Sequence, residues 1–306
     1  MLSDLVSAVD AAIIWYFLGI NSFYGLLLLL SIPEIWKHWK LASSEDVNRY
    51  IGSDALPPIS VLMPAFNMEA SIVPSVRAQL LLKYPQHEVV LINDGSTDAT
   101  FANLRAAFDL YEVPPAIPQR IPTQAVRGYY RSRKAAGLLV VDKENGGKSD
   151  ALNAGLGAAR YPLVLAVDAD TMVESDALLR LARVFLSGRP VAGAGGTIRV
   201  ANGCRIEDGR VAEVHLPRRF LPGVQVPEYL RAFLFGRLGW NRLGGNLIVS
   251  GAFGLFHRQY MLEIGGYATD NVVEDLDLVV RLHKHLRDLG KPYEISFIPD
   301  PLAWTE

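Results

Sequence analysis

An uncharged apolar segment near the start of the chain constrains its structure most. Between Ala11 and Ile32 lie about 22 residues without a charged side chain. An α-helix of about 20 apolar residues spans the hydrocarbon core of a bilayer. Pro33 and Glu34 end the segment. The sequence therefore predicts a transmembrane anchor within residues 1–40.

The residues on either side of the apolar segment predict its orientation. A cleaved signal peptide begins with basic residues, whereas this chain has Asp4 and Asp10 there. A buried core helix is the other alternative. Lys37, His38 and Lys40 follow the segment, and positive residues favour the cytoplasmic side. We therefore expect a single-pass protein of the inner or plasma membrane, with the rest of the chain in the cytoplasm.

Charge and cysteine content exclude two classes of protein. The formal net charge is -2, so the basic excess of a nucleic-acid-binding protein is missing. The chain has a single cysteine, Cys204, which excludes an intramolecular disulfide and a Cys-rich zinc site.

The pattern after the anchor predicts a polar juxtamembrane linker, residues 41–57, and one domain, residues 58–306. Short β-branched runs alternate with helical stretches, which favours an α/β fold with a mostly parallel sheet flanked by helices. The expected strands are Ile59–Met63, Val89–Asn93, Leu138–Val141, Leu163–Val167, Val191–Ala194, Asn246–Phe256 and Ile295–Ile298. The expected helices are Glu69–Leu82, Asp98–Asp109, Ser149–Arg160, Ser175–Leu186, Val226–Leu238 and Glu274–Leu289.

Two stretches between these elements are expected to be irregular. Pro114–Arg133 is rich in Pro and Arg and indicates a surface loop. Glu207–Gly209 is typical of a hairpin turn.

Open α/β sheets bind ligands beyond the carboxyl ends of their strands, so the residues that follow each strand are the candidates. The first strand leads into Ala65, Asn67 and Glu69, where a plain turn and a nucleotide-binding loop are both open readings. The second strand leads into Asp94, whose carboxylate could accept hydrogen bonds from a base or ribose.

The third strand is followed by Gly146, Gly147, Lys148 and Ser149. Two glycines before a helix let backbone N–H groups approach an anion, and Lys148 could pair with a phosphate. The spacing does not match the P-loop motif. A turn with Ser149 as an ordinary helix cap explains these residues equally well.

The fourth strand ends in the strongest local signal, Asp168 and Asp170, one residue apart. Two ionised carboxylates at the end of an apolar strand are costly to leave unpaired. A divalent cation removes their repulsion, and Mg²⁺ binds one or two carboxylates together with substrate phosphates. Capping of the helix near Ser175 is the weaker explanation, because Asp170 lies several residues before it.

Acidic residues also open the last helix. Glu274, Asp275 and Asp277 complement the helix dipole, which is an ordinary structural explanation. The functional hypothesis makes Asp275 a general base toward an acceptor hydroxyl, with Glu274 as its rival. His257 follows a strand and is a candidate third metal ligand, although an ordinary surface or core histidine is the favoured interpretation.

Taken together, these stretches resemble glycosyltransferase family 2, and within it the membrane-bound synthases of cellulose, chitin, hyaluronan and poly-N-acetylglucosamine. The resemblance covers residues 58–306. The matching stretches are Ser60–Asn67, Asn93–Asp98, Asn145–Asn153, Asp168–Asp170, Ser250–Gly254 and Val273–Leu278.

This resemblance implies a GT-A fold and an inverting transfer from a UDP-sugar, UDP-N-acetylglucosamine or UDP-glucose. By analogy Asp94 contacts the uridine and Lys148 contacts the nucleotide or its diphosphate. Asp168 helps to hold the donor and, with Asp170, binds Mg²⁺ or Mn²⁺. Asp275 takes the proton of the acceptor hydroxyl. The residues expected to line the acceptor pocket are Ser250, Gly251, Ala252 and Phe253.

Processive synthases of this family carry a Gln-x-x-Arg-Trp element and further membrane helices after the last helix, and the printed sequence stops at Glu306 before either. A truncated chain or a partner subunit with the missing membrane helices is therefore expected. Three functions remain open: polysaccharide synthesis, non-processive transfer to a lipid-linked acceptor, and nucleotide-sugar binding without catalysis.

Overall fold

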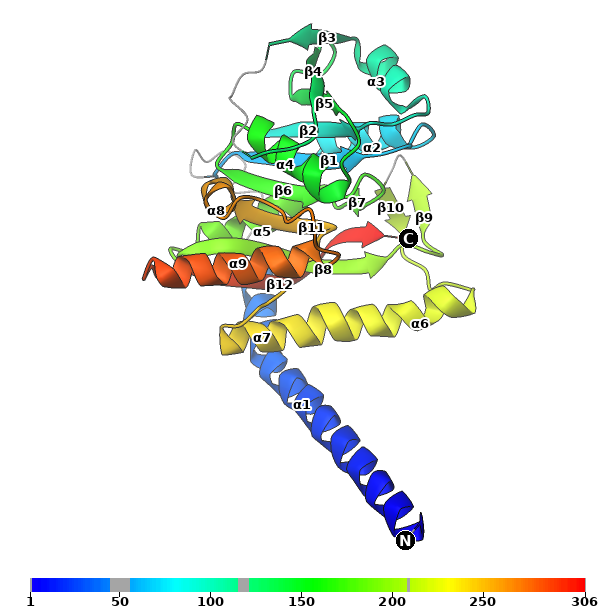
Figure 1. Cartoon of the computed structure of the whole chain (residues 1–306), viewed down its shortest axis with the longest axis vertical. Coiled ribbons are helices and arrows are strands. Elements are labelled where there is room, and N and C mark those ends of the chain that lie inside the picture. Colours follow the sequence, from blue (N-terminus) through cyan, green and yellow to red (C-terminus); the bar gives the residue numbers. More distant parts are fainter. Residues whose placement is uncertain (1, 45–55, 115–120, 208–209, 306) are drawn as a thin grey trace.

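The computed structural model describes residues 2–44, 56–114, 121–207 and 210–305. A long N-terminal helix projects from an α/β domain (Figure 1). Most of the expected linker, residues 41–57, lies outside the described residues, and so do residues 208 and 209 of the expected hairpin turn.

Ten strands of the described chain form one mixed sheet in the order β3-β4-β5-β2-β1-β6-β11-β8-β12-β7. They are β1 (Ile59–Ala65), β2 (His87–Asp94), β3 (Leu110–Val113), β4 (Val126–Ser132), β5 (Leu138–Lys143), β6 (Leu163–Val167), β7 (Met172–Val173), β8 (Val191–Val200), β11 (Phe253–His257) and β12 (Glu294–Thr305). The central strands β5, β2, β1 and β6 run parallel, and β12 runs parallel to β8. The other pairings in this sheet are antiparallel.

Helices cover both faces of this sheet, which confirms the predicted α/β class. The helices of the domain are α2 (Ile72–Leu80), α3 (Thr100–Phe108), α4 (Lys148–Ala158), α5 (Ala177–Phe185), α6 (Phe220–Tyr229), the π-helix η2 (Leu230–Gly236), α7 (Arg237–Leu243), α8 (Arg258–Glu263) and α9 (Glu274–Asp288). Helices α2, α3 and α5 pack on one face, and α4, α8 and α9 pack on the other.

The two apolar cores follow from the alternation of side chains along the strands. Val61 and Met63 of β1 point into the core with α2, whereas Leu62 between them points into the core with α4. Val89 and Val90 of β2 divide in the same way. Strands buried on both faces read as continuous apolar runs, which is why the sequence marked them well.

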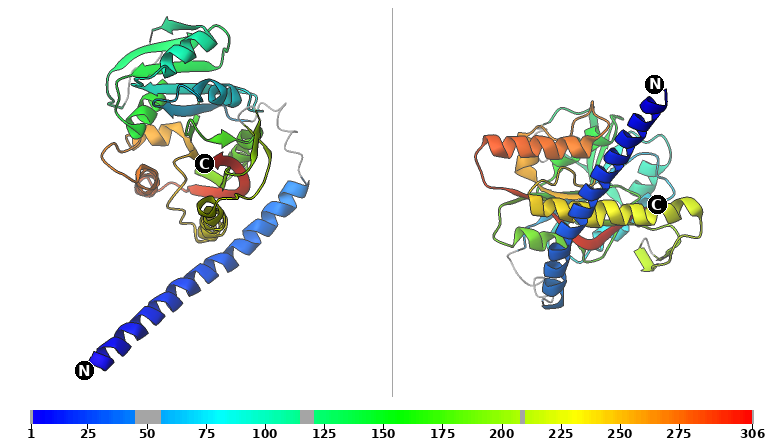
Figure 2. Two further views of the ribbon diagram at one scale, coloured as in Figure 1. Left: turned by 90° about the vertical axis from the view of Figure 1, so that its right-hand side faces the viewer. Right: turned by 90° about the horizontal axis from the view of Figure 1, so that it is seen from below.

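Helix α1 (Leu2–Ser44) carries the apolar segment, and its stretch Ser3–Lys40 is the one helix of the described residues that is long and apolar enough to cross a membrane. Only 6% of its most apolar window is buried in the protein. The alternative of a buried core helix is therefore wrong. Figure 2 shows α1 extending away from the domain and crossing the rod of α6, η2 and α7.

Helix α1 continues beyond Pro33, where the apolar segment ends. A proline inside a helix removes one backbone hydrogen bond. Contacts of the following turns with the domain offset this loss: Glu34 lies 3.4 Å from Arg242 of α7, and His38 lies 2.8 Å from Asp300 of β12. Tertiary contacts therefore support the helix in the turns that follow Pro33.

Several expected elements have different bounds in the structure, among them the strands β8 and β12, which are longer than expected. The expected loop Pro114–Arg133 contains β4, which pairs with β5. The expected strand Asn246–Phe256 is regular only from Phe253 onward, and the expected helix Val226–Leu238 is the middle of the longer rod that begins at Phe220. On either side of the expected turn at Glu207, β9 (Arg205–Glu207) pairs antiparallel with β10 (Arg210–Glu213).

Candidate active site

The site lies where the parallel strands end. Register places Ala65 beside Asn93, and Asp94 beside Lys143, while β6 ends at Val167 on the other side of β1. The residues after these strands therefore meet at one edge of the sheet, as the sequence predicted for an open α/β fold.

The first two loops bind each other. Asn67 Oδ1 accepts a hydrogen bond from the N–H of Thr97 at 2.8 Å. Glu69 Oε2 accepts one from the N–H of Ala99, and Asp98 Oδ2 accepts one from the N–H of Glu69. These polar side chains hold the two loops as one platform, while Ala65 is buried beneath it.

Asp94 is buried and bonded within the protein. Its carboxylate accepts hydrogen bonds from the N–H of Gly146 at 3.0 Å and of Gly147 at 2.8 Å. In this structure the anion that these two glycine N–H groups hold is Asp94. Gly95 makes this approach possible: it has a φ of +69°, and a Cβ there would lie 2.5 Å from the backbone N of Asn145.

Sequence reasoning missed Lys143, the last residue of β5. Its side chain is fully buried, and Nζ lies 2.7 Å from Asp94 Oδ1 and 2.5 Å from Asp150 Oδ1. A buried ammonium is tolerated only when it is paired, and here two carboxylates share it. A lysine that closes an apolar strand was the available signal.

Lys148, at the start of α4, meets the carboxylate pair that follows β6. Its Nζ lies 2.6 Å from Asp168 Oδ1, whereas Asp170 is exposed. Burial raises the pKa of Asp168; Lys148 opposes this rise, and the charges of Asp170 and Glu274 add to it. The negative charges of Asp168, Asp170 and Glu274 therefore act on one another, and Lys148 is the cation that offsets them at Asp168.

This donor set fits a hard divalent cation that completes its coordination with substrate. No cluster of three or more His, Cys, Asp or Glu suited to a metal occurs within residues 2–44, 56–114, 121–207 and 210–305. Mg²⁺, however, needs only one or two protein carboxylates when phosphate oxygens supply other ligands. Asp170, exposed and next to the Lys148–Asp168 pair, is the group that can do this.

The predicted base and the predicted acceptor segment are in contact. Asp275 Oδ2 accepts a hydrogen bond from the N–H of Gly251 at 3.2 Å, and Oδ1 accepts one from Leu276 at 2.8 Å. Ser250, Gly251 and Ala252 are partly exposed. The side chain of Phe253 is fully buried in the core, so the prediction that Phe253 lines an acceptor pocket is wrong.

Tyr267 lies among the acidic groups and was not predicted. Its pKa is raised by burial first, and then by the charges of Glu274, Asp168 and Asp275. Asn153 of α4 exchanges two hydrogen bonds of 2.8 Å with the backbone of Tyr267. The charges of donor-side and base-side carboxylates therefore both act on one buried tyrosine.

Arg237, the first residue of α7, is the second group that sequence reasoning missed. Its guanidinium packs 4.1 Å from the ring centre of Phe233 and 5.3 Å from that of Phe297. Burial lowers the pKa of Arg237 to about 10, and the charge of Asp275 opposes the fall. Its buried Nη1 makes no hydrogen bond with the described residues.

His257 is not a metal ligand candidate in this structure. Strand β11 runs antiparallel to β6, so Phe253 lies opposite Val167 and His257 lies opposite Leu163, at the far end from Asp168. Its ring contacts Phe185 and Tyr260, and burial lowers its pKa. The favoured interpretation as an ordinary histidine explains it.

The fold and the carboxylates at the strand ends define a glycosyltransferase of the GT-A type. Residues 57–306 match the family model described as glycosyltransferase like family 2, and the chain therefore belongs to that family. The predicted resemblance is thus confirmed.

Curated relatives include two poly-beta-1,6-N-acetyl-D-glucosamine synthases. The Staphylococcus epidermidis protein is 27% identical over 247 residues, which is 80% of this chain and 49% of that protein. The Staphylococcus aureus (strain COL) protein is 25% identical over 289 residues, which is 94% of this chain and 58% of that protein. The chain thus spans about half the length of these relatives.

Solved structures share the fold. The mannosyltransferase PcManGT from Pyrobaculum calidifontis, in complex with GDP-Man and Mn²⁺, has a TM-score of 0.54 at 19% identity over 91% of this chain and 68% of that one. S. aureus TarS 1–349 in complex with UDP-GlcNAc has a TM-score of 0.51 at 16% identity, covering 81% and 60%. At these identities the likeness concerns the fold alone.

Proposed function

We propose that the chain is the catalytic part of a membrane-anchored, inverting glycosyltransferase that moves a sugar from a UDP-sugar to a growing polysaccharide on the cytoplasmic membrane face. One observation carries the proposal: the Lys148–Asp168 pair, Asp170 and the Glu274–Asp275 pair gather at one edge of the sheet. UDP-N-acetylglucosamine is the favoured donor, because relatives are named poly-N-acetylglucosamine synthases and one structural neighbour binds it; UDP-glucose is the alternative.

The donor half would bind the nucleotide through a preformed loop. Asp94 fixes Gly146 and Gly147 from inside the protein, so its role is to position the loop rather than to touch the uridine. Lys148 stands at the end of that loop and is about one-third exposed. It can therefore pair with the diphosphate while keeping its contact with Asp168.

Asp170, with Asp168 beside it, would hold Mg²⁺ or Mn²⁺. When bound, such an ion would screen the charge of the diphosphate leaving group. The raised pKa of Asp168 supports this assignment, because crowded carboxylates are relieved by a nearby cation.

Asp275 would act as general base toward the acceptor hydroxyl. The N–H groups of Gly251 and Leu276 fix the orientation of its carboxylate and leave lone pairs for a proton. Glu274 lies close enough to Asp168 to raise the pKa of that residue, so it is placed nearer the donor. We therefore favour Asp275 as the base and Glu274 as a group that orients the donor.

One other function keeps support from a single observation. The apolar anchor beside the catalytic domain favours transfer to a lipid-linked acceptor. The presence of Asp168, Asp170 and Asp275 together argues against a binding protein without catalysis.

The test is UDP release from UDP-N-acetylglucosamine and UDP-glucose in detergent, with and without Mn²⁺ or Mg²⁺. Asp170→Asn should lose the metal dependence of UDP binding, whereas Asp275→Asn should bind UDP normally and lose release. Glu274→Gln, compared with Asp275→Asn, separates the two candidate bases. Wild-type protein that neither binds nor releases UDP would contradict the proposal.

A further inference from the structure

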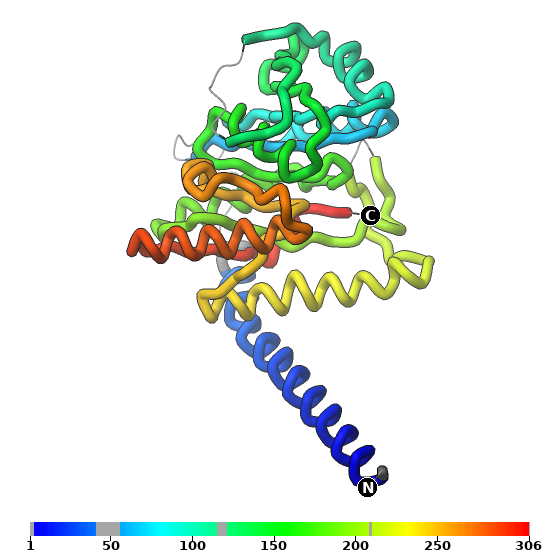
Figure 3. The backbone as a smooth tube through the Cα atoms, viewed as in Figure 1, coloured from blue at the N-terminus to red at the C-terminus, as the bar shows by residue number. Residues whose placement is uncertain are grey.

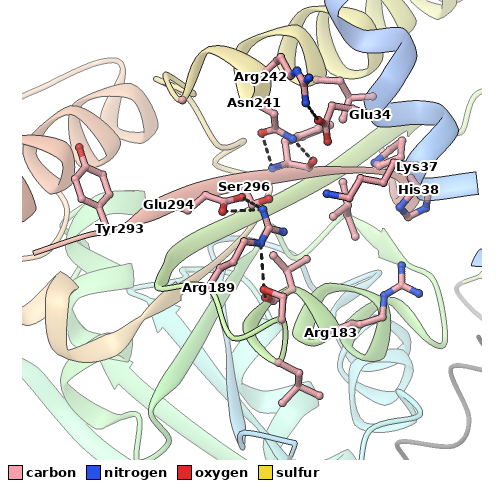
Figure 4. Close-up of a pocket in the computed structure, with 18 residues that line it drawn as sticks. Glu34, Lys37, His38, Arg183, Arg189, Asn241, Arg242, Tyr293, Glu294 and Ser296 are labelled. Carbon is pink, nitrogen blue, oxygen red and sulfur yellow. Dashed lines mark hydrogen bonds and ion pairs between the residues drawn. The ribbon is translucent and has the colours of Figure 1, made fainter. Parts of the chain in front are cut away.

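A cavity of about 690 Å³ lies between the anchor and the catalytic domain, away from the site described above. Helix α1 forms one wall, α7 and β12 form two others, and the end of α5 with the segment after it closes the fourth. Figure 4 shows Lys37 and His38 of α1 around the same opening as Arg183 and Arg189. The volume is in the range of small-molecule binding sites.

The lining is basic. Four Lys or Arg side chains line the cavity, namely Lys37, Arg183, Arg189 and Arg242, against Glu34 and Glu294. Arg189 binds Glu294 with two contacts of 2.8 Å, and Arg242 lies 3.4 Å from Glu34. Lys37 is exposed and makes no ion pair or hydrogen bond with the described parts of the chain. Asp300 of β12 lies 2.8 Å from His38 and interacts with the charge of Arg183, so Lys37 is the cation of this lining that no described acid neutralises.

The position of Lys37 along α1 indicates which anion would reach the cavity. It follows the last residue of the apolar segment, Ile32, by five positions, a rise of about 8 Å in an α-helix. The polar headgroup layer on each side of a bilayer is about 5–8 Å thick. An anchor that spans the bilayer thus places the cavity at the level of lipid phosphates.

We propose that this cavity binds the phosphate of an anionic phospholipid headgroup, with the acyl chains remaining in the bilayer beside α1. Basic pockets next to membrane helices on the cytoplasmic side bind such headgroups by charge attraction. The apolar side chains of α1 that precede the cavity in sequence, such as Leu29 and Ile32, are exposed and offer a surface to the acyl chains. The proposal rests on the membrane anchoring proposed above and is independent of the transferase activity.

The cavity and the candidate active site share α7. Leu238, Asn241 and Arg242 of this helix line the cavity, and Arg237 at its start lies near Asp275. Asn241 exchanges hydrogen bonds with the backbone of Phe297 in β12, which fixes the helix on the sheet. A bound headgroup would therefore hold the helix that carries Arg237.

The experiment measures lipid binding and does not use UDP release. The full chain in an uncharged detergent is titrated with short-chain phosphatidylglycerol, short-chain phosphatidylcholine or inorganic phosphate, and bound molecules are counted by native mass spectrometry. Lys37→Gln is compared with Lys40→Gln. Both remove one positive charge near the membrane surface, but only Lys37 lines the cavity, while Lys40 packs over Trp36.

Phosphatidylglycerol should bind the wild type more tightly than phosphatidylcholine does. Lys37→Gln should weaken that binding by about fivefold, since one Lys near a membrane surface contributes about that much, and Lys40→Gln should leave it unchanged. Equal effects of the two substitutions, or none, would overturn the proposal. Inorganic phosphate that binds as tightly as phosphatidylglycerol would overturn the lipid assignment. Protein missing from the membrane fraction would contradict the anchoring instead, and the UDP assay would be unaffected.

Discussion

The donor-binding strand ends and the half of the domain nearest the anchor satisfy their charges differently. On the donor side, Lys143, Asp94 and Asp150 form a buried cluster in which the ammonium is shared by two carboxylates. On the anchor side, neither the buried Nη1 of Arg237 nor the side chain of Lys37 has a partner among the described residues. The proposed donor site is therefore paired internally, whereas the other half keeps charged groups that no described residue pairs.

The largest expected effect concerns the buried cluster. Lys143→Met should lower the free energy of unfolding by about 3–5 kcal/mol, because it leaves Asp94 and Asp150 buried without their counter-charge. Urea unfolding followed by tryptophan fluorescence measures this. Lys284→Met, at an exposed lysine of α9, is the matched control and should change stability by no more than about 0.5 kcal/mol. Equal losses of unfolding free energy in the two variants would show that the buried charge cluster does not stabilise the donor side.

Arg237 provides the corresponding test of the other half. Arg237→Gln should reduce UDP release about tenfold at unchanged UDP affinity, because it removes a buried positive charge that acts on Asp275. Arg237→Lys should recover part of the activity. The control is Arg231→Gln on the same rod, an exposed arginine that packs over Tyr24. A fall in UDP affinity instead would assign Arg237 to the donor site.

Two glycine substitutions compare the halves directly. Gly95→Ala should cost about 1–2 kcal/mol for its left-handed backbone alone, and its Cβ would collide with the backbone of Asn145. UDP affinity should fall with it, because the Asp94 loop moves. At Gly251 a Cβ would lie 3.4 Å from that of Asp275, an ordinary contact. Gly251→Ala should therefore keep UDP affinity, as isothermal titration would measure, and a loss equal to that of Gly95→Ala would contradict the difference in rigidity.

The smallest effect is expected where the anchor meets the domain. Glu34→Gln removes one member of a partly exposed ion pair with Arg242, and such pairs contribute less than about 1 kcal/mol. The same urea unfolding measurement checks this value. A loss as large as that of Lys143→Met would show that the anchor is part of the folded core.

The residues at the strand ends were predictable, because apolar runs marked the strands and ligand sites in such sheets follow them. Asp168, Asp170 and Lys148 were found in this way. The pairing of Lys143 with Asp94 was not, since it depends on β5 lying beside β2, and strand order is not written in local sequence. The antiparallel direction of β11, which places His257 away from the site, cannot be predicted from the periodicity of apolar residues either.

The contact between Asp275 and Gly251 illustrates a different limit. The sequence marked both segments by resemblance, but their meeting depends on how α9 packs beside the irregular stretch before β11. Arg237 lies within a stretch whose pattern predicts only an amphipathic helix. A single arginine in such a stretch does not indicate a functional site. Long-range packing, rather than propensity, decides both.

Strand β12 also governs the order in which the protein can fold during synthesis. It lies between β8 and the short β7, so residues 294–305 must be inserted beside strands made more than a hundred residues earlier (Figure 3). Pairings between residues so distant in sequence form slowly. On a ribosome, α1 emerges long before β12, so the anchor proposed above can enter the bilayer while the sheet is still open. The catalytic domain would then be completed on a membrane surface that already holds its first helix.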